Sequence, residues 1–385
     1  MNMLLLRIAC CCLGGWWATA CASAGACSVP VFRYALERWS ADLYEVDVFF
    51  RGELTAEERR HLSRLEDAAQ ANGGTVNWEI VRCNIERELP PDLAKVREAL
   101  GDVAWPQVVL RQPGGRRGSP IVWSGPLAMA DENLARSPGR TELMRRLLAG
   151  DAVVWMVLVG DDEQAQAVTH RLQDALATLA EEIPLPSGVG LPGSELFARI
   201  PLKIRFSVQT VDGRDADEAV LRNLLTPHAL AAVTPTETLV VPIFGRGRAL
   251  AVFRAADVEE TLIGDVSRFL CGACSCQVKE SNPGFDLLLS VNWDDQLFGE
   301  DPPPVDARSP PAEAVYVPIP GGLAEPAVAA ASADAAPSQA PPDGHHDAAG
   351  EPRPEPLARR RFGRNTALLA GLLVVIMAVL GARRR

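Results

Sequence analysis

The sequence predicts an α/β protein with two similar units in tandem, followed by a disordered linker and a C-terminal transmembrane helix. Helical and strand periodicities alternate between Cys27 and Phe298. Each half also contains a strand followed by a glycine turn, Val-Val-Leu-Arg-Gln-Pro-Gly-Gly from Val108 and Val-Val-Pro-Ile-Phe-Gly from Val240. This similarity indicates a duplicated unit. The predicted domains are residues 1–26, 27–150, 151–298, 299–358 and 365–382.

The first predicted unit covers residues 27–150. Phe32, Ala35, Leu36 and Trp39 recur at helical spacing, and glycine pairs mark the turns between later segments. In chain order we expect a helix over 32–39, a strand over 46–50, a helix over 55–71, a strand over 76–85, a helix over 90–100, strands over 107–111 and 121–123, and a helix over 141–148.

The second predicted unit covers residues 151–298 and repeats this order more loosely. Residues 184–201 have no counterpart in the first unit, so we expect a long loop there. Gly188 to Gly193 has the glycine spacing of a dinucleotide motif, but it follows a helix and contains Pro192, which favours a loop. The expected elements are a strand over 153–159, a helix over 162–183, a strand over 202–211, a helix over 215–225, a hairpin of 238–244 with 249–254, and a helix over 258–270.

The order of elements in the first unit, with a proline directly before the third strand, resembles the thioredoxin fold. The stretch Trp105-Pro106-Gln107-Val108-Val109-Leu110 is the part that resembles it. The resemblance implies a structural role for Pro106, with a cis peptide bond before it. A generic α/β sandwich is the alternative interpretation.

Disulfide oxidoreductases that resemble this pattern carry Cys-x-x-Cys after the first central strand, where a helix N-terminus lowers the thiol pKa. The first unit has Arg51-Gly52-Glu53-Leu54 at that place, and the second has Gly160-Asp161-Asp162-Glu163. Neither stretch contains a cysteine. The sequence therefore disfavours dithiol exchange at both positions.

Two blocks of sequence are similar to a family of uncharacterised exported bacterial proteins. The first block is Cys-Ser-Val-Pro-Val-Phe-Arg-Tyr-Ala-Leu-Glu-Arg-Trp, from Cys27 to Trp39. The second is Cys-Ser-Cys-Gln-Val-Lys-Glu-Ser-Asn-Pro-Gly, from Cys274 to Gly284. This resemblance implies export but no assigned activity.

The two ends of the chain are hydrophobic. Residues 1–26 have the layout of a secretory signal peptide, with a buried first helix as the alternative. Residues 365–382 are 18 uncharged residues flanked by arginines; as a helix they would be about 27 Å long, close to the roughly 30 Å of a bilayer core. We favour a retained anchor over a C-terminal sorting signal. The predicted location is the bacterial cell envelope, with the folded body outside the cytoplasm.

The acidic charge of the chain is concentrated in its tail. The net charge is −11, and between Asp294 and Leu357 there are 12 acidic residues and two arginines. Residues 301–358 contain 14 of the 30 prolines, a composition that cannot bury enough apolar surface to fold. We therefore predict a disordered acidic linker. No basic cluster indicates nucleic-acid binding.

Removal of the leader leaves five cysteines: Cys27, Cys83, Cys271, Cys274 and Cys276. The last three lie within six residues and suggest a structural disulfide among themselves or to Cys27, a redox site, or a soft-metal site. Cys83 shares a strand face with apolar residues, which favours an inert core thiol. Cleavage after residue 26 would place Cys27 at the N-terminus, where it has a structural role or is lipidated.

The leading functional hypothesis is a binding or assembly component with an unknown protein partner and no cofactor. The missing cysteines at the family's nucleophile positions and the long tether favour it. The alternative is a thiol-redox or metal-handling protein that uses Cys271, Cys274 and Cys276. The C-terminal helix is expected to bind the membrane in either case.

Overall fold

The first half of the chain forms a four-stranded sheet in the order β2-β1-β3-β4. The computed structural model describes residues 28–70, 73–113, 120–274 and 278–301. The strands are β1 (Tyr44–Phe50), β2 (Trp78–Asn84), β3 (Gln107–Arg111) and β4 (Ile121–Pro126). β1 and β2 are parallel, whereas the β1–β3 and β3–β4 pairs are antiparallel. The third strand begins exactly where the sequence predicts it.

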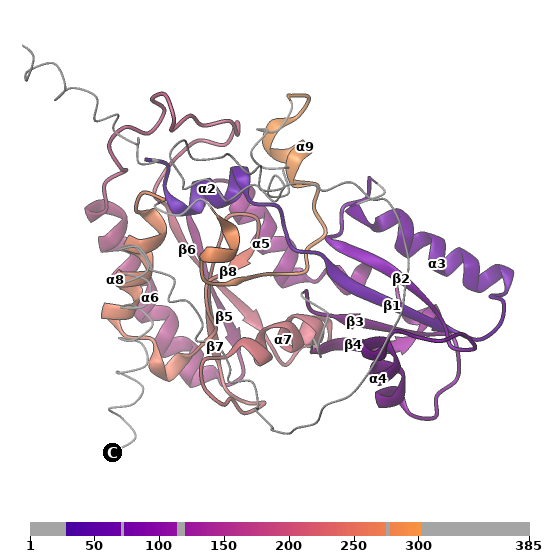
Figure 1. The fold of residues 1–385 in the computed structure, drawn as a ribbon. Helices are drawn as coiled ribbons and strands as arrows, with labels where there is room; N and C mark the ends of the chain where they lie inside the picture. Colours follow the sequence, from indigo (N-terminus) through magenta and orange to yellow (C-terminus); the bar gives the residue numbers. More distant parts are fainter. Residues whose placement is uncertain (1–27, 71–72, 114–119, 275–277, 302–385) are drawn as a thin grey trace, which may run out of the picture. The chain divides into compact units, whose positions relative to one another are not determined.

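Two helices cover opposite faces of this sheet (Figure 1). Helix α3 (Ala56–Ala68) begins with a capping box, in which Thr55 Oγ1 accepts from Glu58 N at 3.2 Å and Thr55 N donates to Glu58 Oε2 at 2.7 Å. Its Leu62 and Leu65 pack on one face of the sheet. Helix α4 (Pro91–Leu100) places Leu93 on the other face.

The second half forms a second sheet with the same central order. Its strands are β5 (Val153–Val159), β6 (Phe206–Asp212), β7 (Leu239–Phe244), β8 (Arg248–Ala249), β9 (Phe253–Arg254) and β10 (Phe285–Asp286). The order is β10-β8-β7-β5-β6, and β5 is parallel to β6 but antiparallel to β7. The α/β fold class with two sheets is confirmed, and each sheet has a parallel pair followed by antiparallel strands.

The strand registers support the predicted duplication. Phe49, the penultimate residue of β1, pairs with Gln107, and Leu158, the penultimate residue of β5, pairs with Leu239. Gln107 and Leu239 therefore occupy equivalent positions. Val108 and Val240, which the sequence comparison aligned, follow them directly.

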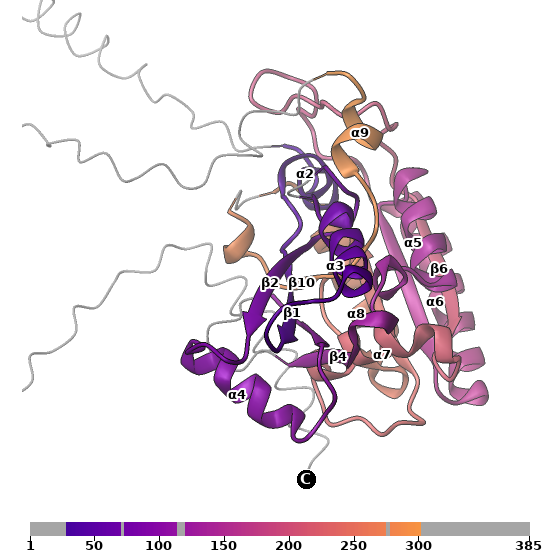
Figure 2. The same ribbon diagram turned by 90° about the vertical axis from the view of Figure 1, so that its right-hand side faces the viewer.

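The remaining helices pack mainly around the second sheet. Helix α6 (Asp162–Glu182) and helix α8 (Glu260–Cys271) line one face, while α5 (Pro138–Leu148) and α7 (Ala219–Leu225) contribute to the core on the other. Figure 2 shows α4 on the side of the molecule away from α5 and α6. The last described helix is α9 (Trp293–Phe298). Residues 184–201 contain no helix or strand, as predicted.

The first helix among the described residues, α2 (Val31–Arg38), packs with the second sheet and not with the first. Within this helix, Arg33 Nε lies 2.7 Å from Glu37 Oε1, and both side chains are buried. The Glu37 carboxylate also accepts hydrogen bonds from the backbone of Phe197 and Ala198, at 3.1 and 3.0 Å. The amphipathic spacing predicted the helix correctly but gave no information about which sheet it would cover.

Several elements begin or end differently from the sequence expectations. β6 begins at Phe206, four residues later than predicted, and α5 begins at Pro138, three residues earlier. Asp294 and Asp295 lie in the first turn of α9, where carboxylates interact favourably with the helix dipole. No pattern in the sequence indicates the two-residue strand β10.

The predicted signal peptide over 1–26, most of the predicted linker over 299–358 and the predicted transmembrane helix over 365–382 lie outside the described residues. Within the part that is described, no helix is both long and apolar enough to span a bilayer. Export and membrane anchoring therefore stay predictions from the sequence.

A buried ion cluster lies in the middle of the first sheet. Arg111 Nε is 2.5 Å from Asp47 Oδ2, and the same guanidinium bonds Glu45. Asp47 is fully buried. Desolvation by burial raises the pKa of Asp47 above its ordinary value, although the hydrogen bond from Arg111 acts in the opposite direction.

Replacing Arg111 with methionine (Arg111→Met) should lower the free energy of unfolding by about 3–5 kcal/mol, because it leaves a buried carboxylate without its partner. The folded-state pKa of Asp47 is already raised, so proton uptake by this group favours the folded state and its ionisation at higher pH opposes folding. The deficit of the variant should therefore shrink as the pH falls from about 8 to about 5.

Urea denaturation at several pH values measures this effect. The control is Arg145→Met, which removes an exposed pair with Glu142 and should change stability by less than about 1 kcal/mol. A deficit of Arg111→Met that stays constant across the pH range would contradict the assignment of the penalty to Asp47.

Candidate functional site

The candidate functional site in the first unit lies where β1 ends and α3 begins. The Trp105–Pro106 peptide bond is cis, as the resemblance to thioredoxins implied. A cavity of about 330 Å³ opens beside it, lined by Thr55, Glu57, Glu58, His61, Ala104, Trp105, Pro106, Gln107, Pro126, Leu127 and Ala128. The ring of Trp105 packs against Phe49, with 6.4 Å between the ring centroids.

This cavity has no side chain that could exchange a disulfide. The stretch from Arg51 to Leu54 lies between β1 and α3, and Thr55 and Glu58 close the helix N-terminus by the capping box described above. Capping uses backbone donors that would otherwise stabilise an anion or a thiolate. The cavity can hold a side chain or a peptide segment, but among the described residues it presents no nucleophilic sulfur.

The equivalent place in the second unit is closed by a threonine. Thr238 precedes Leu239, so it holds the position that Pro106 holds in the first unit. Its Oγ1 accepts from Gly160 N at 3.1 Å and Asp161 N at 3.0 Å, and it donates to Asp161 O at 2.9 Å. The start of α6 is therefore tied directly to the start of β7.

Close packing also leaves no room for a cysteine in place of Gly160. A Cβ atom at this position would lie 2.5 Å from Glu237 O and 2.6 Å from Thr236 O. Such contacts are shorter than any real Cβ contact and involve backbone atoms that cannot move aside. The second unit is thus built without room for a side chain at the start of its nucleophile stretch.

Replacing Thr238 with valine (Thr238→Val) should cost about 1–3 kcal/mol in unfolding free energy, since it leaves the amides of Gly160 and Asp161 without their shared acceptor. Urea denaturation measures the loss. Thr236→Val is the matched control, because Thr236 is exposed. Equal stabilities of the two variants would show that Thr238 does not hold this end of the sheet together.

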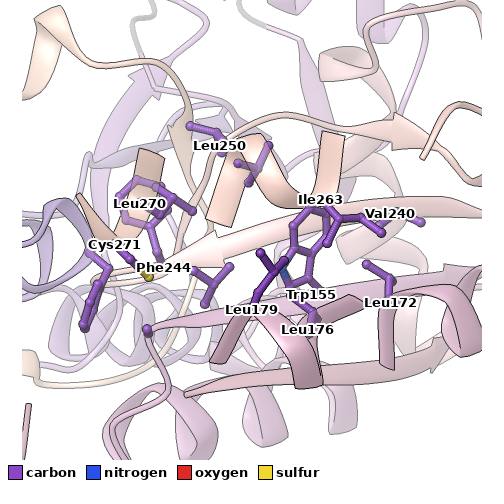
Figure 3. Close-up of a cluster of buried hydrophobic side chains, with 14 of the residues drawn as sticks. Trp155, Leu172, Leu176, Leu179, Val240, Phe244, Leu250, Ile263, Leu270 and Cys271 are labelled. Carbon is purple, nitrogen blue, oxygen red and sulfur yellow. The ribbon is translucent and has the colours of Figure 1, made fainter. Parts of the chain in front are cut away.

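The cysteine cluster predicted from the sequence lies at the C-terminal end of α8. Cys271 is the last residue of the helix, and both Cys271 and Cys274 are buried in the core of the second unit. Figure 3 shows Cys271 among apolar side chains that include Phe244 and Leu270. Burial raises the pKa of Cys271 to about 12. A helix C-terminus and an apolar environment both disfavour a thiolate.

Cys83 is the third described cysteine and agrees with the expected core thiol. It is 2% exposed and lies in the small core between the first sheet and α4. Burial, with a smaller contribution from Asp47, raises its pKa to about 12. The thiol is therefore protonated at neutral pH.

The other two mature cysteines, Cys27 and Cys276, lie outside the described residues. Their described neighbours are close together, because Cys274 N donates to Val29 O at 2.8 Å and Pro30 pairs with Ala273. The two sequence blocks that resemble an exported bacterial family thus contact each other. In the described part of the chain, where Cys276 is not included, no group of three or more metal-binding side chains could hold an ion.

Cys83 and Cys271 should resist alkylation by iodoacetamide at about pH 8. With pKa values of about 12, roughly one thiol in ten thousand is ionised at that pH, and burial also blocks access. Peptide mass spectrometry after labelling of the native and the guanidinium-unfolded protein measures this. The unfolded protein is the control and should be labelled at both residues. Fast labelling of Cys271 in the native protein would contradict the buried, protonated thiol.

A second and larger hollow, which was not predicted from the sequence, lies at the end of β2. This cavity has a volume of about 790 Å³. It adjoins another of about 500 Å³ along α3, and Arg59 and Ser63 line both. The signal for it in the sequence is the spacing of the arginines at positions 59, 60 and 64 in the predicted helix.

Comparison with known proteins adds little to this description. No family model matches the sequence, and the search of curated proteins finds no significant match. Among solved structures, the chain is similar to full-length ERdj5, with 9% identity and a TM-score of 0.19 over 52% of this chain and 26% of that chain. It is also similar to the first two thioredoxin domains of Saccharomyces cerevisiae Eps1p, with 10% identity and a TM-score of 0.17 over 59% of this chain and 92% of that chain.

The chain therefore spans about a quarter of the length of ERdj5. The matched part of Eps1p consists of two thioredoxin domains, and this distant likeness concerns the fold alone. The thioredoxin-like fold of this chain rests on the strand order β2-β1-β3-β4, its repetition in the second sheet, and the proline before β3.

Proposed function

We propose that this chain is an exported, membrane-tethered protein of thioredoxin-like fold that binds a protein partner and performs no dithiol exchange. The main observation in favour is that neither nucleophile position can act. In the first unit a capping box occupies the helix start, and in the second Thr238 and the backbone around Gly160 leave no space for a side chain.

The cavity of the first unit supports a binding function. The cavity beside Trp105 and Pro106 is open, half of its lining is apolar or aromatic, and the carboxylates of Glu57 and Glu58 lie at its rim. A cavity of this kind holds side chains of a partner, since apolar surface with a few polar groups is typical of recognition sites. Without a thiol, the contact would be reversible and non-covalent.

The tether belongs to the same proposal. A signal peptide over 1–26 would export the body, the proline-rich linker over 299–358 would hold it away from the bilayer, and residues 365–382 would anchor it in the membrane. An extended reach favours capture of a partner that lies elsewhere in the cell envelope. The partner itself is a protein of that compartment.

A pull-down of the full-length protein from solubilised membranes should recover a specific partner, while the purified protein should not reduce insulin disulfides with dithiothreitol as electron donor. Insulin turbidity measures the second property, with thioredoxin as the positive control. Replacing both Cys271 and Cys274 with serine should change neither result. Reductase activity that is lost in this double variant, or Cu(I) binding that is lost in it, would establish the thiol-based alternative instead.

A further inference from the structure

The outer edge of β2 has backbone groups that no described residue uses. β2 is the margin of the first sheet and pairs with β1 alone. Two hydrogen bonds at the ends of this ladder show which residues of β2 turn their backbone groups toward β1. They run from Tyr44 N to Asn77 O at 3.0 Å and from Ile85 N to Phe50 O at 2.9 Å. In a parallel ladder, alternate residues turn both N–H and C=O to the same side. Ile80 and Arg82 therefore direct both groups away from β1.

An unpaired edge of this kind is a template for another strand. Among the described residues, none bonds to the outward backbone groups of Ile80 or Arg82. Figure 2 shows β2 on the left of the molecule, away from α5 and α6. Charged side chains, such as Glu79 and Arg82, protect the edge from indiscriminate pairing, yet its backbone stays accessible.

The larger cavity surrounds the carboxyl end of the same strand. Its floor is apolar and includes Leu62 from the α3 side and Val81, Cys83 and Leu93 from the α4 side. A peptide that extends β2 would enter this cavity with the side chains at its end. The cavity thus offers a pocket for an apolar side chain next to the open edge.

The rim of the cavity and its continuation along α3 are basic. Five arginines line the two adjoining cavities, against two glutamates: Arg59, Arg60, Arg64, Arg82 and Arg87 with Glu53 and Glu88. Arg82 is neutralised by Glu66 at 2.5 Å. No described residue bonds the guanidinium groups of Arg60 and Arg87, and both side chains are exposed. A ligand with carboxylates would complement these charges.

We infer that the β2 edge and the arginine-lined groove beside it bind an extended, acidic segment of a partner protein, which adds to the first sheet as a further strand. Backbone hydrogen bonds to Ile80 and Arg82 would give affinity, and the apolar floor and the arginines would select the sequence. This inference rests on the proposed binding function and specifies where the partner docks.

Fluorescence anisotropy with the full-length protein in detergent tests the inference. The probe is a fluorescein-labelled eight-residue peptide of alternating glutamate and valine. We expect it to bind, and we expect Arg60→Glu combined with Arg87→Glu to weaken binding about tenfold, as two lost charge contacts imply. Arg97→Glu is the matched control, because Arg97 is exposed on α4 but lines neither cavity, and it should leave affinity unchanged.

Two further probes separate strand addition from simple charge attraction. A lysine–valine peptide should not bind. Methylation of alternate backbone nitrogens of the glutamate–valine peptide gives two probes, one methylated at the glutamates and one at the valines. Only the probe whose methyl groups point toward β2 should lose binding. Equal binding of all these peptides, or no binding of the unmodified one, would overturn the inference. Ile80→Pro, which removes an outward N–H, should also abolish binding; thermal unfolding checks that this variant folds.

Hydrogen exchange of the Ile80 and Arg82 amides identifies the occupant. These amides should exchange rapidly in the free protein and slowly with the peptide bound. Protection in the free protein, from a second copy or from the chain's own segments, would overturn the inference. If a partner is recovered equally well by the wild type and by the Arg60→Glu, Arg87→Glu variant, the docking site is wrong while the binding function stands. Recovery of no partner by the wild type contradicts the function itself.

Discussion

The carboxylate of Asp286 holds together parts of the chain that are distant in sequence. Asp42 N donates to Asp286 Oδ2 at 2.8 Å, and Arg248 donates to Oδ1 at 3.0 Å. Lys279, one of only three lysines, bonds both Asp42 and Asp286. Because Asp286 is buried, its charge must be compensated where it lies. The entry to β1 and the end of the second sheet are thereby fixed to each other.

This network makes the two repeated units depend on one another. Residues after Asp286 run on beside the first sheet, where Leu289 N donates to Asn77 Oδ1 at 2.8 Å and Val291 N donates to Thr75 O at 2.7 Å. The first helix, α2, packs instead with the second sheet. Each sheet therefore contributes to the burial of segments from the other half of the sequence. The described residues of both sheets lie in one compact unit.

Local patterns in the sequence predicted most of the helices and central strands. The runs that form β3 and β5 are short, apolar and bounded by turn residues, so their positions followed from periodicity. The packing partner of α2 and the strand β10 could not be predicted, because they depend on contacts between residues more than 200 positions apart, such as Tyr44 and Asp286.

Two features of the candidate site were predictable from the sequence: the cis peptide bond before Pro106 and the lack of cysteine at the nucleophile positions. The absence of cysteine after β1 and β5 could be read directly once the strands were placed. The role of Thr238 at the position of Pro106 could not be predicted, because a threonine before a strand has no distinctive pattern. This role depends on hydrogen bonds to residues 77 and 78 positions earlier. The hollow at β2 also depends on tertiary structure, because its floor combines side chains from both faces of one sheet.

The internal repeat offers a comparison for the open edge. β6 is the counterpart of β2 in the second sheet, and α5 packs against it. There Arg146 donates to Val208 O at 3.2 Å, and Gln209 donates to Gly139 O at 2.7 Å. In the second unit a side chain of α5 thus bonds one outward carbonyl of the edge strand, whereas no described residue bonds the outward backbone groups of Ile80 and Arg82 in the first unit. Because both sheets share the same central strand order, the exposure of β2 is a property of this strand and its neighbours and not of the topology, so the proposed docking edge belongs to the first unit alone.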